Sequence, residues 1–568
     1  MKPDWYQDSL TTWPEVLDRQ AKTQGERTFL VMDDRTVSYA AFRNEADRVA
    51  RGLLALGVSK GDVVALYMTN SIEWVICQFA IYKAGAILLP LYSYYRESEL
   101  GYALEQSGAS ALIMQDRFLG KVDACAIART SIPELDTAPA DAFSSAKFPS
   151  LQNIVRVGSG EDLPSRHTLE TVIERGDAIP PAALAARQAE ITPFDVMNIM
   201  YTSGTTGFPK GGMSMHVTNL VTTHQWSRLA GLGQDDVILC HVPLFTNFGG
   251  LYGAPLGMRN GAKVVITEQF DAGRSLELIE THAVTYIPGT PSMFRMLLDH
   301  PDIATRNLSS VRGGHVAGAP LTDATMQDIL DVLGAERIMQ AWGLSECGGL
   351  STVTTADDPR EKRLSTVGKP LASAVLRIVD DQGREVEQGA QGEILLGDAL
   401  PGSCVGKGYW KMPEKTAQTI DEQGFFHTGD VGFLDVDGYL HITGRVDDMF
   451  TVGGFNIYPA EIEKRLEEMA GVREAHVIPV ADRRMGNLPA AWIVPDPGNP
   501  PTAEAVARHV RTLMTSQKVP RRVFFCAAED LPRTPVGKLK KKDLLRMTAE
   551  KVAIDPDAGL VRSEERTK

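Results

Sequence analysis

Between residues 38 and 116, the hydrophobic positions of this chain follow two different patterns, one typical of helices and one typical of strands. The first pattern places apolar residues three and four positions apart and ends near Gly57, so it predicts an amphipathic helix. The residues of its buried face are Phe42, Ala46, Val49 and Leu53. A second helix is predicted from a cap at Asn70 or Ser71 to Lys83.

Short apolar runs stand between these helices. Residues 62–68, 87–92 and 111–115 have the length and composition of buried strands. Because strands that alternate with helices form βαβ units, we expect mainly parallel sheets with helices on both faces. The predicted fold class is therefore α/β. Residues 117–190 are rich in Pro, Ala, Ser and Asp and are less regular, so no chemistry is assigned to them.

A loop rich in glycine and hydroxyl groups follows the apolar run 196–200, and a helix-like pattern begins after Met213. Glycine lets a backbone approach an anion closely, while hydroxyl groups and a lysine add donors and positive charge. The residues concerned are Thr202, Ser203, Gly204, Thr205, Thr206, Gly207 and Lys210. A flexible Ser/Gly linker is the alternative, but a linker needs neither a preceding strand nor a Pro-Lys step. The Walker spacing is absent, so we interpret the stretch as a phosphate loop of another kind.

Residues 201–212 read Tyr-Thr-Ser-Gly-Thr-Thr-Gly-Phe-Pro-Lys-Gly-Gly and closely resemble the signature of the adenylate-forming superfamily. That superfamily comprises acyl-CoA synthetases, adenylation domains of peptide synthetases and beetle luciferases. Residues 340–346 resemble its aromatic-Gly-x-Thr-Glu motif, with Trp and Ser in place of the usual Tyr and Thr. An aromatic residue followed by glycine offers adenine a flat face, and a carboxylate offers Mg²⁺ a hard oxygen. The expected nucleotide contacts are Gln340, Ala341, Trp342, Gly343 and Ser345, and the expected metal ligands are Glu346 and Thr202.

A Phe-His-Thr-Gly-Asp motif continues the resemblance and contains Asp430. A carboxylate that accepts two hydroxyl hydrogen bonds is suited to hold ribose. Taken alone, an aspartate in a tight turn is the commoner interpretation. Its place in the series of motifs favours the ribose role. By the same resemblance Arg445 contacts the nucleotide and Asp447 is the hinge residue between two domains.

The last motifs lie beyond the hinge. The resemblance implies that the loop containing Gly453 and Gly454 contacts the pantetheine arm of CoA. It also assigns Lys538 as the catalytic lysine of adenylation, although Val536 stands where the family generally has Thr or Ser. Lys540 to Lys542 are interpreted as a solvated basic face or as contacts to CoA phosphates rather than as a nucleic-acid patch.

The predicted domain organisation follows these motifs. Residues 1–444 form a large N-terminal adenylation domain, 445–450 the hinge, and 451–548 a small mobile α+β domain. A helix is expected to begin at Pro459 and to bury Ile462, Leu466 and Met469. From residue 549 the chain becomes polar and charged, so residues 549–568 are expected to form a flexible tail.

The pocket for the acid is expected between three segments of the N-terminal domain. Its predicted members are Phe245, Thr246, Asn247, Phe248, His315, Val316, Ala317 and Leu344, and Gly318, Ala319 and Pro320 form a turn that lines the adenine and acyl sites. Core packing is the alternative for the apolar turn at 241–250. The family usually has His where Thr246 stands, so no imidazole role is transferred to that position. Asn247 or His315 could contact a polar substituent of the acid.

Composition narrows the class of protein. Lys and Arg number 58 against 72 Asp and Glu, a net charge of −14, which argues against non-specific nucleic-acid binding. The six cysteines form no C-x-x-C pair, as expected for reduced thiols. The N-terminus has no apolar signal segment, and the most apolar window, 74–92, is interrupted by Lys, Gly and Pro. We therefore expect a cytoplasmic protein without a membrane span; a homodimer is left open.

The resemblance covers nearly the whole chain and implies an AMP-forming acid–CoA ligase that uses ATP, Mg²⁺ and CoA. Lys538, Thr202 and Glu346 would be the catalytic residues. The acid expected is a medium- or long-chain fatty acid or an aryl acid. The alternatives are an adenylating enzyme that loads a separate carrier protein, a luciferase-like oxidation, and a non-catalytic adenylate-binding homologue.

Overall fold

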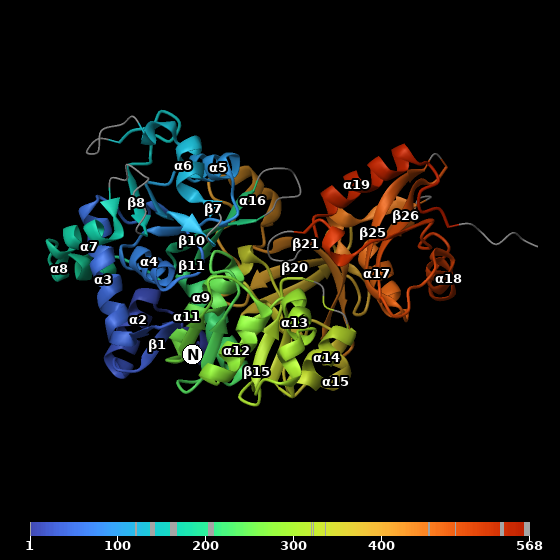
Figure 1. Ribbon diagram of the computed structural model, residues 1–568, viewed down its shortest axis with the longest axis horizontal. Helices are drawn as coiled ribbons and strands as arrows, with labels where there is room; N and C mark the ends of the chain where they lie inside the picture. The colour runs from blue at the N-terminus through green and yellow to red at the C-terminus, as the bar shows by residue number, and fades with distance from the viewer. Residues whose placement is uncertain are drawn as a thin grey trace, which may run out of the picture.

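The computed structural model describes residues 2–119, 122–136, 143–158, 167–202, 209–319, 321, 323–335, 337–452, 455–482, 484–533 and 539–561. A large N-terminal part occupies one side of the molecule and a smaller C-terminal part the other, as Figure 1 shows. The predicted division into a large α/β domain and a small second domain is confirmed.

The largest sheet has nine strands in the order β18-β17-β16-β15-β14-β12-β13-β1-β2. Its central strands, from β16 to β1, are parallel, and antiparallel strands close both edges. In chain order they are β1 (Thr28–Met32), β2 (Arg35–Ser38), β12 (Val237–Cys240), β13 (Lys263–Ile266), β14 (Tyr286–Gly289), β15 (Gly313–Val316), β16 (Arg337–Trp342), β17 (Thr352–Val353) and β18 (Lys369–Pro370).

The second sheet has seven strands in the order β11-β10-β4-β3-β5-β8-β9. All neighbours are parallel except the hairpin of β10 and β11 at one edge. Its strands are β3 (Val63–Tyr67), β4 (Ile87–Pro90), β5 (Ala111–Gln115), β8 (Asn153–Val157), β9 (His167–Thr168), β10 (Val196–Thr202) and β11 (Lys210–Met215); β6 (Arg117–Phe118) and β7 (Val122–Asp123) form a separate hairpin.

Helices cover both of these sheets, as the βαβ pattern predicts. They are α1 (Asp4–Gln7), α2 (Trp13–Gln24), α3 (Tyr39–Ala55), α4 (Ile72–Lys83), α5 (Glu97–Ser107), α6 (Ala124–Ser131), α7 (Leu169–Asp177), α8 (Pro181–Ala189), α9 (His216–Ala230), α10 (Asn247–Tyr252), α11 (Ala254–Asn260), α12 (Ala272–His282), α13 (Pro291–Leu298), α14 (Asp323–Leu333), α15 (Arg360–Ser365) and α16 (Pro413–Thr419).

An antiparallel four-stranded sheet, β19-β20-β21-β22, precedes the hinge, and a five-stranded sheet with three helices follows it. The first sheet contains β19 (Ala374–Val379), β20 (Gly392–Asp398), β21 (Phe426–Leu434) and β22 (Leu440–Arg445). The second contains β23 (Phe450–Val452), β24 (Phe455–Ile457), β25 (Val472–Asp482), β26 (Gly486–Pro495) and β27 (Arg522–Phe525), with α17 (Pro459–Glu467), α18 (Ala503–Leu513) and α19 (Lys541–Ile554).

Helix α4 lies in the main core and is buried on every side, which its largely apolar sequence predicts. Ser71 caps its first turn by accepting a hydrogen bond from the Trp74 amide. Its last residue, Lys83, is fully buried and pairs with Asp18 and Asp47, each at 2.8 Å. These two carboxylates compensate the buried charge and tie α4 to α2 and α3.

Three of the predicted elements need correction. Residues 210–215 form strand β11, so the helix after Met213 begins only at His216. The less regular segment 117–190 contains β8 and helices α6 to α8. The tail expected from residue 549 is wrong for residues 549–561, because α19 continues to Ile554 and the segment after it hydrogen-bonds to Arg521 and Val523.

Candidate active site

The hairpin of β10 and β11 places two predicted site residues side by side. Thr202 ends β10, Lys210 begins β11, and the two are paired across the hairpin. The connecting residues Ser203, Gly204, Thr205, Thr206 and Gly207 lie outside the described part of the chain. Lys210 Nζ stands 5.7 Å from the ring centre of Tyr409. Burial and Lys415 lower the pKa of Lys210, while Asp447 and Glu346 partly offset that effect.

Glu346 lies just beyond β16 and joins this hairpin to the chain that follows β20. Its Oε1 accepts hydrogen bonds from Thr202 Oγ1 and from the Tyr409 hydroxyl, both at 3.2 Å. Burial and the neighbouring Glu346 carboxylate raise the pKa of Tyr409 far above its ordinary value, so Tyr409 stays a neutral donor. The backbone of β11 passes very close, since a Cβ on Gly212 would stand 3.0 Å from Glu346 Cγ.

The chemistry of this carboxylate fits a magnesium ion bound together with substrate phosphates. Oε2 of Glu346 accepts no hydrogen bond from the described residues, and the Thr202 hydroxyl lies beside Oε1. No group of three or more His, Cys, Asp or Glu side chains able to hold a metal is found in the described ranges. A hard cation held by one carboxylate, a hydroxyl and phosphate oxygens needs no such group.

A second cluster forms where β16 meets β21 and β22. The Trp342 indole Nε1 donates to Asp430 Oδ2 at 2.7 Å, and Arg445 pairs with Asp430 Oδ1 at 3.1 Å. Asp430 is buried, and it lies opposite Arg445 in the strand register. Both carboxylate oxygens are thus held in place before any ligand binds. Arg445 also lies near enough to Tyr409 to lower its pKa slightly, so the two clusters belong to one site.

The chain around Trp342 leaves little room for side chains. A Cβ on Gly343 would meet Gly349 O at 1.9 Å, so only glycine fits there. Gln340 and Ala341 are buried within β16, and Ser345 begins the short 3-10 turn that carries Glu346. Gly318 has a φ of +87° and is followed by Ala319, whereas Pro320 is not among the described residues.

Thr246 has a structural role that explains its presence. The predicted turn after Phe245 is helix α10, and the Thr246 side chain accepts from the Gly249 amide at 3.2 Å as its N-cap. Asn247 and Phe248 begin that helix and are partly exposed. Phe245 packs against Tyr92, with ring centres 5.1 Å apart.

His315 lies at the end of β15 in a box of aromatic rings. The ring centres of Phe248, Trp226, Tyr252 and Tyr286 lie 4.8 to 5.7 Å from its own. Trp226 Nε1 donates to the Tyr286 hydroxyl, and that hydroxyl is also hydrogen-bonded to His315 Nδ1 at 2.9 Å. Burial lowers the pKa of His315 to about 3, so the ring is neutral at pH 7.

His315 Nε2 has no hydrogen-bond partner among the described residues. Val316 and Ala317 are buried beside it, and Leu344 packs on the cluster that contains Cys347 and Tyr409. Of the predicted acid-pocket residues, Leu344 is thereby placed beside the glutamate site. A neighbouring pocket of about 240 Å³ extends past Phe245 between the carboxyl ends of the two parallel sheets.

The comparisons with known proteins cover both parts of the chain. Residues 17–410 match the AMP-binding enzyme family, and residues 461–538 match the AMP-binding enzyme C-terminal domain. The chain belongs to the AMP-binding enzyme family. A methyl-dioxo-octahydro-indenyl propanoyl:CoA ligase of Mycobacterium tuberculosis is 34% identical over 94% of this chain and 99% of its own length. The mitochondrial medium-chain acyl-CoA ligase ACSF2 of Danio rerio is 32% identical over 93% of this chain and 86% of its own length.

A solved AMP-binding enzyme has the same architecture. The anthranilate CoA ligase AuaEII, crystallised with anthranoyl-AMP, superposes with a TM-score of 0.83 at 28% identity and covers 98% of this chain and 100% of its own. All three relatives are ligases that match this chain over nearly its full length.

The remaining predicted residues belong to the part of the chain from the hinge onward. Asp447 stands in the short turn Val446–Asp448. Gly453, Gly454 and Lys538 fall outside the described residues. Lys541 is not on a solvated face as predicted, because its Nζ pairs with Asp448 at 2.9 Å and also approaches Glu463. The expected helix from Pro459 is confirmed, with Ile462 and Leu466 buried and Met469 lying just beyond its end.

Sequence reasoning missed two sets of residues. Tyr409 lies in the segment Gly408-Tyr-Trp, to which no predicted role was attached. Trp226, Tyr252 and Tyr286 surround His315 from three different helices and strands. The spacing of these aromatic residues along the chain does not predict that arrangement.

Proposed function

We propose that this enzyme is an AMP-forming acid–CoA ligase, which converts a carboxylic acid, ATP and CoA into acyl-CoA, AMP and pyrophosphate. The observation that carries the proposal is that Thr202, Glu346 and Tyr409 meet beside the Trp342–Asp430–Arg445 cluster. One cluster suits phosphates and the other suits ribose, with an aromatic acid pocket beside them.

In the first half-reaction the carboxylate of the acid attacks the α-phosphorus of ATP and pyrophosphate leaves. This step needs alignment of the two anions and neutralisation of charge more than covalent help from the protein. Lys210 and the Thr202 hydroxyl face the departing phosphates, while Asp430 accepts the ribose hydroxyls. Lys538, which lies beyond the described residues, would neutralise charge at the α-phosphate. Mg²⁺ beside Glu346 would supply further positive charge to the phosphates.

In the second half-reaction the CoA thiolate attacks the carbonyl carbon of the acyl-adenylate and AMP leaves with the bonding electron pair. The C-terminal domain would turn about Asp447, remove Lys538 and present the loop at 453–454. Arg445 stays on the N-terminal side of this hinge and continues to hold Asp430, so the nucleotide keeps its position during the turn.

The acid is proposed to be a medium- or long-chain fatty acid or an aryl acid. The pocket past Phe245 supports this class, because Phe245, Phe270 and Met293 contribute apolar side chains to its lining. A hydroxyl substituent that reached His315 Nε2 would satisfy that atom, which has no partner among the described residues. The relatives named above act on bulky, medium-chain and aromatic acids, which also supports the proposal.

A cytoplasmic location is proposed as well, supported by six free cysteines. None of the helices in the described ranges could cross a bilayer.

The decisive experiment separates the two half-reactions. Lys538→Ala should reduce pyrophosphate release with acid and ATP by about a thousandfold, since one charge contact to the reacting phosphate is lost. The same variant should still convert supplied acyl-adenylate and CoA into thioester. Lys551→Ala, at an exposed position of α19 in the same domain, is the matched control and should keep both rates. Equal loss of both steps in Lys538→Ala would remove this lysine from its proposed role.

The alternative of a separate carrier protein is tested in the same assay. Thioester formation with free CoA at micromolar concentration supports the ligase, whereas adenylate that accumulates with CoA and reacts only with a carrier thiol supports the alternative.

A further inference from the structure

An open pocket of about 380 Å³ lies between helices α2, α9 and α11. Its lining is rich in positive charge and contains no carboxylate. The residues are Arg19, His224, Ser227, Arg228, Gly231, Leu232, Arg259 and Asn260. We call this set the basic pocket. Three guanidinium groups at one place are unusual in a chain whose net charge is −14.

The guanidinium groups of the basic pocket lack anionic partners. None of Arg19, Arg228 and Arg259 forms an ion pair with a carboxylate of the described residues. Arg259 donates to His224 Nδ1, but its second terminal nitrogen, Nη1, is buried without a partner in the same set of residues. A buried donor without a partner costs about 1–3 kcal/mol, and more when it is charged. The negative ends of the α9 and α11 dipoles offset only part of that cost, about 0.3–1 kcal/mol for each arginine in the last turn.

The positive charges of the basic pocket also shift the pKa values of its own members. Burial and then Arg19 lower the pKa of Arg259 to about 10. Burial and then Arg259 lower the pKa of His224 to about 4, so His224 is neutral at pH 7. Since Arg259 donates to Nδ1, His224 carries its proton on Nε2 and is itself a donor. Asp4 and Asp8, near α1, oppose these shifts but do not line the pocket.

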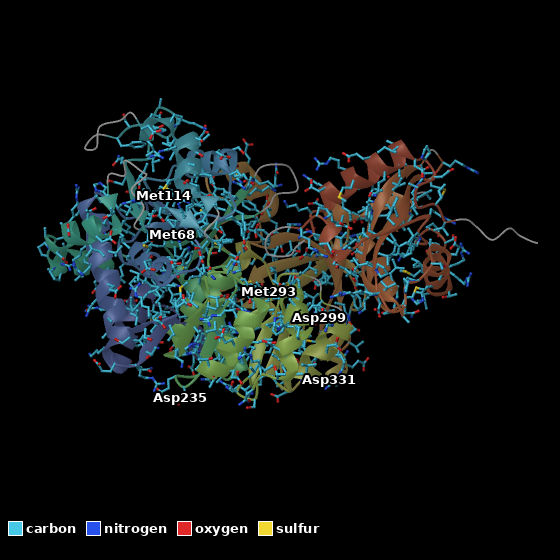
Figure 2. The ribbon with its side chains drawn as sticks, in the orientation of Figure 1. Met68, Met114, Asp235, Met293, Asp299 and Asp331 are labelled. Carbon is cyan, nitrogen blue, oxygen red and sulfur yellow. The ribbon has the colours of Figure 1, made fainter. Side chains whose placement is uncertain are left out.

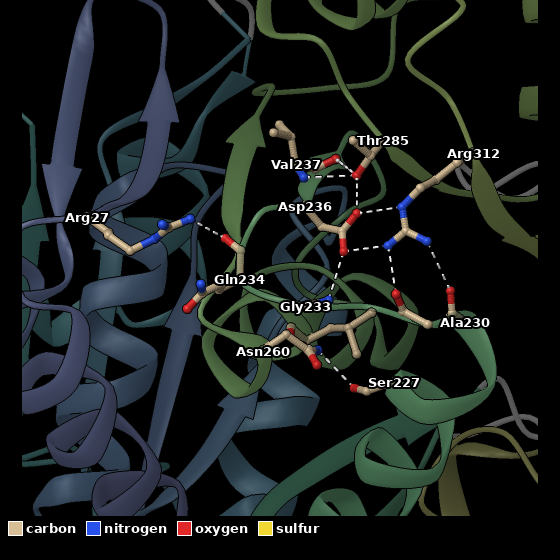
Figure 3. A network of polar contacts seen from close by, with 12 residues as sticks. Arg27, Ser227, Ala230, Gly233, Gln234, Asp236, Val237, Asn260, Thr285 and Arg312 are labelled. Carbon is tan, nitrogen blue, oxygen red and sulfur yellow. Dashed lines mark hydrogen bonds and ion pairs between the residues drawn. The ribbon is translucent and has the colours of Figure 1, made fainter.

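A neighbouring arginine, Arg312, has a purely structural role and is paired differently. Arg312 is bound by both oxygens of Asp236 and donates to Gly231 O at 2.8 Å, as the network in Figure 3 shows. In the same network Asn260 donates to Ser227 Oγ at 2.8 Å, which fixes two polar members of the basic pocket. Asp236 therefore neutralises Arg312, whereas no carboxylate lines the basic pocket beside it to neutralise its arginines.

The basic pocket is separate from the ligase site. It lies at the C-terminal ends of α9 and α11 and at the loop before β12, whereas Thr202 and Lys210 lie beyond the opposite end of α9. The 15 residues of α9 span about 22 Å at 1.5 Å per residue. In Figure 1 α2, α9 and α11 stand in the N-terminal part, away from the C-terminal domain with which CoA is proposed to interact.

We propose that the basic pocket binds a phosphate group, either as inorganic phosphate or as the monoester of a small molecule. A tetrahedral dianion matches three guanidinium groups that line one pocket, since guanidinium groups bind phosphate oxygens in pairs. His224 Nε2 adds a neutral donor, while Ser227 and Asn260 already donate to Thr223 O, Leu256 O and Ser227 Oγ and shape the wall of the pocket. This site lies outside the ligase reaction and does not depend on it.

The test measures phosphate binding with the nucleotide site already filled. Isothermal titration calorimetry is done with inorganic phosphate at constant ionic strength, on enzyme saturated with Mg²⁺ and a non-hydrolysable ATP analogue. The test variant is Arg19→Gln with Arg228→Gln, both exposed residues, so folding should be kept; circular dichroism checks this. The control is Arg360→Gln with Arg384→Gln, which removes the same charge from exposed ion pairs elsewhere.

We expect wild type and control to bind phosphate with dissociation constants within about twofold, and the test variant to bind at least about tenfold more weakly, with unchanged ligase kinetics. A second titration with glycerol 3-phosphate distinguishes the two forms of the ligand. Tighter binding than that of inorganic phosphate favours a monoester, and weaker binding favours the free anion. Equal binding by all three proteins, or no binding by wild type up to about 10 mM, overturns the proposal.

Discussion

At the scale of single residues, Glu346 performs two tasks with its two carboxylate oxygens. Oε1 accepts hydrogen bonds from the hydroxyl groups of Thr202 and Tyr409, whereas Oε2 accepts none from the described residues. The first oxygen therefore positions the side chain and the second is available for a cation. This division of work can be tested by removing charge and hydrogen bonds separately.

Glu346→Gln should raise the Mg²⁺ concentration needed for half-maximal pyrophosphate release by about tenfold, because the amide keeps the shape but loses the charge. Tyr409→Phe is the control, since it removes one hydrogen bond to Oε1 and leaves the charge. Its metal dependence should stay within about twofold of wild type. A magnesium titration of Glu346→Gln that matched wild type would exclude Glu346 as a ligand.

Trp342→Phe keeps an aromatic face but removes the indole donor to Asp430. Losing a hydrogen bond to a carboxylate costs about 1–2 kcal/mol, so KM for ATP should rise about five- to twentyfold with a smaller change in kcat. If Asp430 holds the ribose, the preference for ATP over 2′-deoxy-ATP should also shrink. Trp410→Phe, whose indole donates to Ser107 O instead, should leave that preference intact. An unchanged preference in Trp342→Phe would separate Asp430 from ribose.

At the scale of elements, Glu467 ends α17 and makes the C-terminal domain sensitive to pH. Burial raises the pKa of Glu467 to about 8, only partly opposed by a hydrogen bond from the Ala475 amide. The folded state then binds a proton that the unfolded state, with an ordinary pKa of 4.5, has lost. The stability that neutral Glu467 contributes is fully present below about pH 4.5 and is lost as the pH rises through about 8.

Glu467→Gln should remove this dependence. Between pH 5.5 and 8.5, wild type should lose about 3 kcal/mol more unfolding free energy than the variant. The measurement is urea unfolding of the full chain at both values, followed by tryptophan fluorescence. Glu468→Gln, the exposed neighbour paired with Arg465, should behave as wild type. Parallel pH profiles for wild type and Glu467→Gln would contradict the assignment.

The sequence predicts those elements best whose hydrophobic pattern is locally complete. The helix with Phe42 and Leu53 on its face and the strand at 111–115 occur as expected. The tail from residue 549 was wrong because α19 buries only Leu544 and Thr548, a face too narrow to be seen against its charged residues. Lys541 was misjudged for a related reason: its partner Asp448 is 93 residues away. Contacts of that kind depend on tertiary structure and leave no local pattern.

The same dependence on tertiary contacts explains which parts of the candidate active site the sequence predicts. Five residues come together as the motifs indicated, because each motif contains glycines and lies near the end of a strand. These residues are Thr202, Glu346, Trp342, Asp430 and Arg445. The box around His315 could not be foreseen. Its tyrosines and tryptophan come from α9, α10 and β14, and each alone resembles ordinary core.

At the scale of the whole molecule, exposed ion pairs join the two domains. Lys464 stands 3.6 Å from Asp323, and Arg473 pairs with Asp299 at 2.7 Å. Asp299 is labelled in Figure 2 on the side of the N-terminal part that faces the C-terminal domain. Because exposed pairs contribute little, about 0–1 kcal/mol each, these contacts permit the domain rotation that the two half-reactions require.

Asp447→Pro should therefore affect the two steps unequally. Proline fixes φ at about −65°, which a 3-10 turn tolerates but a rotation about this residue does not. Adenylate formation should fall less than about threefold, while thioester formation should fall by a hundredfold or more. Asp447→Ala removes the same carboxylate and leaves the backbone free, so both rates should be kept. Equal slowing of both steps by the proline would place the hinge elsewhere.

The pair of Lys541 with Asp448 has a consequence for recombination between relatives. Asp448 lies at the junction where a chimaeric gene would naturally exchange its C-terminal domain, whereas Lys541 is encoded near the far end of the exchanged part. A crossover placed after residue 448 takes the acid from one parent and the base from the other. Hybrids keep this ion pair only when the first parent supplies an acid at position 448 and the second supplies a base at position 541.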